Sequence, residues 1–172
     1  MSESMSGKVI SILHHGDEYV AGVFTSKGLY ATSLPRSSLD DAIEAVGGFD
    51  LPEVRNDEYL RILYTVIEIC NGVRDAEKKR PSLDFSDLTP KQIAVLKTTL
   101  NIPYGSAWTY GLVAQKSGLP GAARFVGNVM AINRFAPIVP CHRVVSTTGL
   151  GGYTGGLDLK ESLLSKEGAI AD

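Results

Sequence analysis

The sequence predicts an α/β protein of the α+β kind, in which a small sheet-and-helix lobe precedes a mainly helical lobe. Short runs of β-branched and aromatic residues with turns between them fill the first part of the chain. Capped stretches of helical periodicity fill the second part, and a polar segment lies between the two. A chain of 172 residues can form one buried core, or two small lobes that share one. We place the lobes at residues 1–85 and 86–172.

The first lobe is expected to begin with a sheet and to continue with two helices. The predicted strands are residues 8–15, 18–24 and 28–34. Residues 37–48 follow as a helix with a serine cap, early acidic residues and a glycine stop. Residues 56–72 form a longer amphipathic helix that begins at an Asn-Asp pair and stops at an Asn-Gly pair. Cys70 lies on this apolar helix, so we interpret it as a small buried hydrophobic residue.

A polar segment, residues 73–87, is the expected boundary between the lobes. It contains the basic cluster Lys78-Lys79-Arg80, which has acidic residues on both sides. This mixture of charges favours a solvated linker over a binding patch.

Four helices are expected in the second lobe, at residues 88–101, 109–119, 120–133 and 157–169. Thr89 caps the first of these helices, and Pro120 begins the third. The two middle helices, joined by a tight Ser-Gly-Leu turn, match a winged helix-turn-helix, whose second helix reads a DNA groove. Helical hairpins also occur as plain packing units, so the pattern alone leaves both interpretations open.

The net charge of −2 hides an asymmetry between the lobes. Residues 1–85 carry nine Lys and Arg against fourteen Asp and Glu, whereas residues 86–172 carry eight against five. No acidic residue occurs from Leu88 through Leu157. Such a segment does not repel a polyanion, so nucleic acid is a natural partner. The alternative is a chance clustering of charge on a solvated surface.

The composition favours a globular protein in a reducing compartment. Hydrophobic residues make up 44% and charged residues 21% of the chain. No apolar run approaches the roughly 18 residues that span a bilayer, and the N-terminus lacks the signature of a signal peptide. With only two cysteines, we expect no disulfide framework. We therefore expect a cytoplasmic protein with no membrane partner.

The most informative residue is Cys141, which lies in the motif Pro-Cys-His-Arg. A nucleophilic cysteine needs a nearby positive charge or hydrogen-bond donor, and His142 and Arg143 are its neighbours in sequence. Adjacent residues point apart, so a water that bridges Cys141 and His142 fits better than direct contact. Glu167 on the last helix is a plausible group to orient the histidine. The alternative is a buried structural thiol beside a satisfied histidine.

A metal site is not expected. Cys70 and Cys141 are far apart in the sequence, and the other histidines form the pair His14-His15, which does not have zinc-ligand spacing. We expect no metal and no cofactor.

Three motifs together resemble one protein family. "PCHRVV" is preceded by "AARFVGNVMAIN" and followed by "GGYTGGLDLKESLLSKEG". These motifs and their spacing resemble the O6-alkylguanine-DNA alkyltransferases, also called methylated-DNA–protein-cysteine methyltransferases. The resemblance covers most of the second lobe, from "LTPKQI" and "IPYGSAWTYGLVA" onward, and is loose in the first lobe.

The resemblance implies a chemistry and its residues. Cys141 would accept the alkyl group from O6 of guanine, His142 would be the water-linked base, and Glu167 would orient that histidine. The product is a thioether, which lies outside the reversible thiol oxidation ladder, so one molecule would repair one lesion and be spent. The partner would be double-stranded DNA that contains O6-alkylguanine, with the damaged base flipped out of the helix. We expect a monomer.

The resemblance also implies supporting roles. Asn133 would hold the active-site turn against the recognition helix, Tyr110 would help rotate the nucleotide and protonate guanine, and Lys160 would assist that tyrosine. Arg124 would replace the extruded base in the stack. Further DNA contacts are implied for Tyr110, Ala122, Ala123, Thr89, Gly111, Leu119 and Thr147. Substrate contacts are implied for Val144, through its carbonyl, and for Tyr153, Thr154 and Met130.

Two departures from the family pattern bear on the size of the pocket. Thr154 replaces a serine that is common in the family, and Ala136 lies where some members have a proline. Two other functions stay open: a winged-helix regulator that binds DNA without chemistry, and a cysteine hydrolase or thiol-redox protein. The regulator gives Cys141 no task, and the hydrolase predicts repeated turnover.

Overall fold

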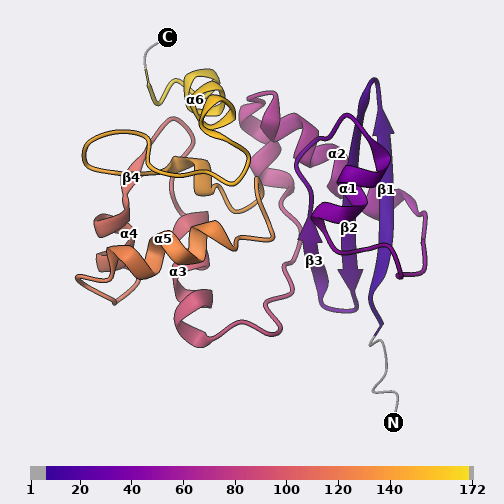
Figure 1. Ribbon diagram of the computed structural model, residues 1–172, viewed down its shortest axis with the longest axis horizontal. Helices are drawn as coiled ribbons and strands as arrows, with labels where there is room; N and C mark the ends of the chain where they lie inside the picture. The colour runs from indigo at the N-terminus through magenta and orange to yellow at the C-terminus, as the bar shows by residue number, and fades with distance from the viewer. Residues whose placement is uncertain (1–6, 171–172) are drawn as a thin grey trace. The chain divides into compact units, whose positions relative to one another are not determined.

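The computed structural model describes residues 7–170, and it contains two compact units that divide between Ser86 and Asp87. Each unit contains both helix and strand, as the mixed α/β prediction requires (Figure 1). No helix in the described range is long and apolar enough to cross a membrane.

The first unit is built on a three-stranded antiparallel sheet in the order β1-β2-β3. The strands are β1 (Val9–His15), β2 (Glu18–Thr25) and β3 (Gly28–Thr32). They confirm the three predicted runs, since apolar β-branched residues pair across the sheet, as Ile10 does with Val23. The register shifts between Val23 and Phe24, where β2 bulges against β3.

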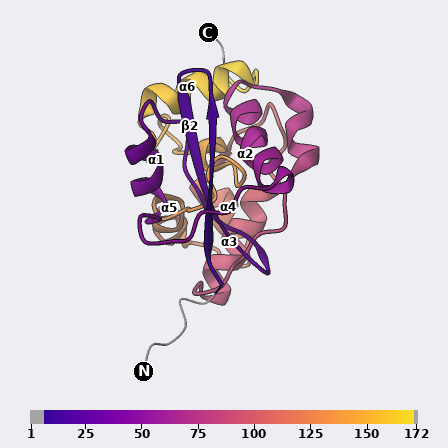
Figure 2. The same ribbon diagram turned by 90° about the vertical axis from the view of Figure 1, so that its right-hand side faces the viewer.

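One helix covers each face of this sheet. Figure 2 shows the sheet nearly edge-on, with α1 (Leu39–Ala45) and α2 (Asp57–Cys70) on opposite sides. Both helices start where their caps predict, at Ser38 and Asn56, whose side chains accept from backbone N–H groups. Gly22 allows α2 to pack closely, because a β-carbon at this position would lie 2.6 Å from Leu63.

The segment predicted as a solvated linker has more structure than expected. Arg74–Lys79 forms a 3₁₀ turn, η1, and the chain then runs beside β3. Leu29 N donates to the Ser82 carbonyl (2.9 Å), and Asp84 N donates to the Leu29 carbonyl (2.8 Å). The segment therefore extends the sheet edge of the first unit, because its backbone satisfies the outer side of β3.

The second unit consists of four main helices and two very short strands. The helices are α3 (Pro90–Leu100), α4 (Tyr110–Lys116), α5 (Ala123–Ala131) and α6 (Leu157–Lys166). Thr89 caps α3 in a capping box with Gln92, and Thr109 caps α4. The α4–α5 hairpin confirms the predicted pair of middle helices, and its two members pack on each other.

Two details of the second unit differ from the prediction. Helix α5 begins at Ala123 and not at Pro120, because Gly121 takes the left-handed region (φ 80°) and interrupts any earlier helical turn. In addition, β4 (Trp108–Thr109) pairs in parallel with β5 (Val144–Val145), and no such strands were predicted. This pairing places the segment after Cys141 directly beside the start of α4.

Candidate active site

Cys141 lies at the start of a single 3₁₀ turn, η2 (Cys141–Arg143), that leads directly into β5. Proline favours such a turn because its φ is preset, and Pro140 accepts from Arg143 N at 2.9 Å. Cys141 N donates to the Val139 carbonyl at 2.8 Å. These backbone hydrogen bonds fix the main chain around Cys141. Cys141, His142 and Arg143 are all buried.

A cavity of about 280 Å³ opens beside the thiol. It is lined by residues from α4, α5, the Cys141 turn and the glycine-rich segment: Tyr110, Gly127, Met130, Ala131, Cys141, Gly152, Tyr153 and Thr154. An apolar cavity of about 150 Å³ holds a benzene ring, so this space suits a planar bicyclic base with a small substituent. Four of the predicted site residues other than Cys141 lie on its wall: Tyr110, Met130, Tyr153 and Thr154.

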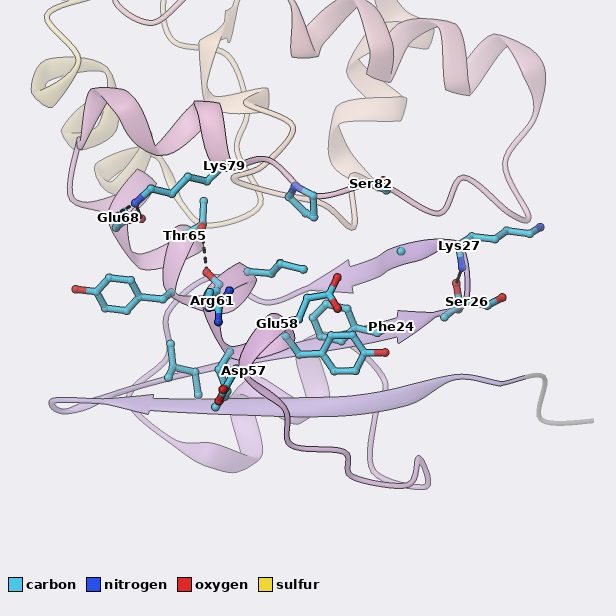
Figure 3. A pocket seen from close by; sticks show the side chains of 18 residues that line it. Phe24, Ser26, Lys27, Asp57, Glu58, Arg61, Thr65, Glu68, Lys79 and Ser82 are labelled. Atoms are coloured by element: carbon cyan, nitrogen blue, oxygen red, sulfur yellow. Dashed lines mark hydrogen bonds and ion pairs between the residues drawn. The ribbon is translucent and has the colours of Figure 1, made fainter.

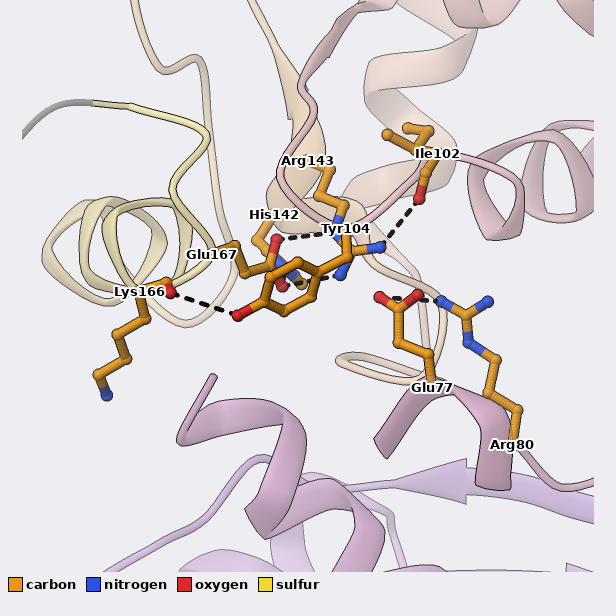
Figure 4. Close-up of polar contacts among 8 residues, drawn as sticks. All are labelled: Glu77, Arg80, Ile102, Tyr104, His142, Arg143, Lys166 and Glu167. Atoms are coloured by element: carbon orange, nitrogen blue, oxygen red, sulfur yellow. Dashed lines mark hydrogen bonds and ion pairs between the residues drawn. The ribbon is translucent and has the colours of Figure 1, made fainter. Parts of the chain in front are cut away.

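Behind the cysteine, Glu167 is shared by the two basic residues of the motif, as Figure 4 shows. Its Oε1 lies 2.8 Å from His142 Nε2, and its Oε2 accepts from Arg143 Nε at 2.7 Å. Arg143 Nη2 also donates to Oε1 at 2.8 Å, and Nη1 donates to the Ile102 carbonyl at 2.9 Å. The guanidinium is thus directed to Glu167 and a backbone carbonyl.

The charge of Glu167 determines which ring nitrogen of His142 carries a proton. Burial alone would raise the pKa of Glu167, but hydrogen bonds from His142 and Arg143 outweigh burial and lower its pKa to about 2. The carboxylate is therefore ionised at neutral pH and can only accept. His142 Nε2 must donate to it, which leaves Nδ1 as the acceptor in the neutral imidazole. A water at Nδ1 could lose a proton to it.

Asn133 stabilises the turn that precedes the cysteine. Its Nδ2 donates to the Val139 carbonyl at 3.0 Å, and its Oδ1 accepts from Phe135 N at 3.0 Å. It follows the end of α5 directly, so it links that helix to the buried stretch before Cys141. Its role in the reaction stays a prediction.

The protonation of the thiol depends on its burial, on Asn133 and on the charge of Lys160. Burial raises the pKa of Cys141, whereas a hydrogen bond with Asn133 and the positive charge of Lys160 act in the opposite direction. Burial lowers the pKa of Lys160 to about 8, and the nearby Cys141 opposes that shift. The resting thiol is therefore protonated, so a base must remove its proton before it can act as a nucleophile.

Lys160 and Tyr110 meet at the glycine-rich segment. Lys160 Nζ donates to the carbonyls of Val144 and Gly152, the latter at 2.9 Å. Tyr110, the first residue of α4, accepts at its hydroxyl from Gly152 N at 3.3 Å. Val144 does not line the cavity, and its carbonyl is already engaged by Lys160.

The residues predicted to contact DNA lie mainly at the ends of helices. Thr89 caps α3, Gly111 is the second residue of α4, and Leu119 lies between α4 and α5. Ala122 and Ala123 form the start of α5, and the side chain of Arg124 follows them and is exposed. Thr147 is exposed in the segment after β5. Their contacts with DNA stay predictions.

Several residues of the site were not predicted. Gly127, Ala131 and Gly152 line the cavity because they are small, and a small residue gives no sequence signal of its own. Arg143 was noted only as a neighbour of Cys141 in the sequence, and its guanidinium binds Glu167.

A second, larger groove lies in the first unit and lacks this chemistry. It measures about 1150 Å³ and lies between α2 and the β2–β3 hairpin. Phe24 stacks on Tyr59 there. Figure 3 shows Phe24 and the Lys79–Glu68 ion pair in this groove. Neither cysteine nor histidine lines it. Among the described residues, no cluster of His, Cys, Asp and Glu has a metal-binding arrangement.

The second unit matches a known family model. Residues 90–169 match the one described as 6-O-methylguanine DNA methyltransferase, DNA binding domain. A methylated-DNA–protein-cysteine methyltransferase of Mycolicibacterium paratuberculosis is 48% identical over 77 residues, which cover 44% of this chain and 47% of that protein. One of Thermococcus gammatolerans is 38% identical over 117 residues, 67% of this chain and 64% of that protein. The match spans about half the length of most such relatives.

Two solved structures share the fold of both units. The crystal structure of Mycobacterium tuberculosis OGT in complex with DNA has a TM-score of 0.69 and 27% identity, and the match covers 93% of this chain and 92% of that one. An O6-methylguanine-DNA methyltransferase of the hyperthermophilic archaeon Pyrococcus kodakaraensis has a TM-score of 0.66 and 26% identity, with 93% and 99% covered.

Proposed function

Because the chain belongs to the O6-alkylguanine-DNA alkyltransferase family, we propose that it repairs DNA by moving an alkyl group from O6 of guanine to Cys141. One observation carries the proposal: a buried cysteine lies against a base-sized cavity and directly precedes a histidine whose tautomer a carboxylate determines. The transfer is stoichiometric, and each protein molecule acts once.

The proposed reaction is a displacement at the alkyl carbon. The thiol proton of Cys141 passes through a bridging water to Nδ1 of His142, and Glu167 stabilises the imidazolium that forms. The sulfur then forms a bond to the alkyl carbon while the bond from that carbon to O6 breaks. The departing guanine takes a proton from the Tyr110 hydroxyl, solvent restores that proton, and the His142 imidazolium releases its own proton to solvent. The products are a thioether and an unmodified guanine.

The base must leave the duplex to reach the cavity. Small residues at the start of α5, Ala122 and Ala123, allow the backbone to approach the narrow minor groove closely. Arg124 then fills the space in the base stack. The exposed residues predicted to contact DNA, together with the segment that lacks acidic residues, bind the DNA phosphates. The affinity for DNA should therefore fall as the salt concentration increases. We further propose that the protein acts as a monomer in the cytoplasm.

Titration with methylated duplex tests the activity against its alternatives. Transfer should stop at one methyl group per protein molecule, and Cys141→Ala should transfer none while it still binds DNA. A product that keeps accumulating would indicate a hydrolase. An alanine variant that loses nothing measurable would indicate a regulator that only binds DNA.

A further inference from the structure

We propose that Lys160 is a positioning residue, which ties the glycine-rich segment 149–156 to β5 and so holds one wall of the Cys141 cavity in place. This assignment adds a structural role to the expectation that Lys160 assists Tyr110. The tether is a property of the fold, while its importance for transfer rests on the proposed function.

The contacts of the ammonium define the tether. Lys160 lies in the first turns of α6 and is completely buried. Its Nζ donates to the carbonyl of Val144, which begins β5 just after the Cys141 turn, and to the carbonyl of Gly152, which lines the cavity. A buried ammonium requires hydrogen-bond acceptors, and here the two acceptors come from two different segments, β5 and the glycine-rich segment. The Lys160 ammonium therefore links the start of β5, just after the Cys141 turn, to the cavity wall at Gly152.

The glycine-rich segment needs such a partner. It has five glycines among eight residues, so little side-chain packing can order its backbone. The segment is otherwise bonded through neutral groups, such as Thr154 Oγ1 to the Ala131 carbonyl (3.3 Å) and Ser146 Oγ to the Gly149 carbonyl (3.0 Å), both exposed. The bond from Lys160 to Gly152 is charged and part-buried, and its donor is a buried lysine, which makes it the strongest of the set.

Lys160 lies near the Tyr110 ring, but its hydrogen bonds go elsewhere. Nζ lies 5.9 Å from the centroid of that ring, within cation–π range, while both of its hydrogen bonds go to backbone carbonyls. Gly152 connects the two residues, because its carbonyl accepts from Lys160 while its N–H donates to Tyr110. Lys160 thus acts on Tyr110 through the position of the segment. Its charge also acts on the thiol of Cys141, as described above.

Hydrogen exchange measured by mass spectrometry tests the tether without any substrate. Lys160→Met keeps the length of the side chain and removes both donors, so exchange of the peptide that spans residues 149–156 should become at least about tenfold faster. Lys166→Met is the matched control, because Lys166 is an exposed lysine on the same helix. This control should leave exchange of the segment unchanged, and peptides from α3 should be unchanged in both variants.

A second readout separates positioning from proton donation. In Lys160→Met, the single-turnover rate with free O6-benzylguanine should fall together with the protection of the whole segment. Tyr110→Phe should slow transfer and release the Gly152 amide, which loses its acceptor, while the other amides of the segment stay within about threefold of wild type. A rate that falls while the segment keeps its protection would overturn the proposal. Should Lys160→Met fail to fold, Lys160→Gln, which keeps a neutral donor, carries the same measurement with the same expected loss of protection.

The exchange result does not depend on the proposed activity. If wild-type protein transfers no alkyl group, the proposed function fails, while faster exchange in Lys160→Met would still establish the tether. If wild-type protein transfers the group and exchange is unaffected by Lys160→Met, the tether fails alone.

Discussion

Glu167 determines the chemistry available to its two neighbours at the scale of single residues. Its carboxylate accepts from both His142 and Arg143, so one buried negative charge faces two basic groups. Because this carboxylate accepts from Nε2 of His142, Nδ1 is the nitrogen that can take a proton when Cys141 reacts. The base on His142 is therefore the sequence neighbour of the Cys141 thiol, whose pKa is raised by burial.

The low pKa of Glu167 makes its contribution to stability depend on pH. A carboxyl group with a pKa of about 2 in the folded protein and 4.5 in the unfolded chain stabilises the fold fully above pH 4.5, and this contribution is lost as the pH falls toward 2. Glu167→Gln should therefore lower the free energy of unfolding by a few kcal/mol at pH 7. The difference from wild type should shrink below about pH 4.5.

Denaturant unfolding from pH 7 to pH 3 measures that difference. Asp158→Asn on the same helix is a control, because Asp158 is exposed and should change stability little. If the difference in unfolding free energy between wild type and Glu167→Gln stays constant down to pH 3, His142 and Arg143 do not stabilise the ionised carboxylate.

At the scale of elements, the glycine-rich segment fits against the start of α4 with little space to spare. Gly151 has φ of 73°, and a β-carbon there would lie 2.6 Å from the Tyr110 hydroxyl oxygen. A larger residue at this position would have to displace the tyrosine or the segment. This precise fit links the shape of the cavity to one backbone conformation.

Gly151→Ala should consequently slow transfer by more than about tenfold, because both the left-handed backbone and the contact with Tyr110 become strained. Gly149→Ala is the matched control: it lies in the same segment, its φ is outside the left-handed region, and its nearest neighbour atom would be 4.0 Å away. Single-turnover rates with the free base and with duplex give the comparison. Equal rates for the two variants would remove the proposed constraint on the segment.

Asn133 joins two elements, so its replacement should lower stability as well as activity. Asn133→Ala loses the bonds to Val139 and Phe135, which should cost about 1–3 kcal/mol and lower the melting temperature by at least about 3 °C. Asn128→Ala, at an exposed position on α5, is the control. Slower transfer at an unchanged melting temperature would assign Asn133 to the chemistry alone.

Local signals explain which elements could be predicted from the sequence. Helix starts at Ser38, Thr89 and Thr109 were predicted because a cap bonds within its own turn. The start of α5 was missed because Pro120 reads as a helix start, whereas the conformation of Gly121 decides otherwise. Strands β4 and β5 have two residues each and exist only through pairing across the unit, which no local pattern encodes.

The site could be predicted in part for the same reason. Cys141, His142 and Glu167 are reactive residue types, and a motif or a charge marks them. Lys160 was expected to assist Tyr110, which stays a prediction. The hydrogen bonds of Lys160 to backbone carbonyls could not be predicted, because backbone carbonyls have no signature in a sequence.

Charge is distributed unevenly over the molecule as a whole. Acidic residues are absent from Leu88 through Leu157, and that stretch contains the cysteine turn and the α4–α5 hairpin. The acidic residues concentrate in the first unit. Attraction for a polyanion therefore belongs to the second unit, where the cavity also lies.

Arg124 tests whether a DNA duplex, and not only a free base, is the substrate. Arg124→Ala should slow transfer from alkylated duplex by at least about tenfold and leave transfer from free O6-benzylguanine within about twofold. Arg55→Ala, an exposed arginine in the first unit, should affect neither substrate. Equal losses on both substrates would contradict the proposal that Arg124 occupies the vacated base stack.

The most direct test of the central claim is the intact mass of the protein after exposure to excess methylated duplex, followed by peptide mapping. Irreversible transfer predicts that every molecule gains the mass of one added methylene unit, and that this addition maps to Cys141 and stays there under thiol reductants. An unchanged mass, an addition at another residue, or one that reductant removes would contradict it.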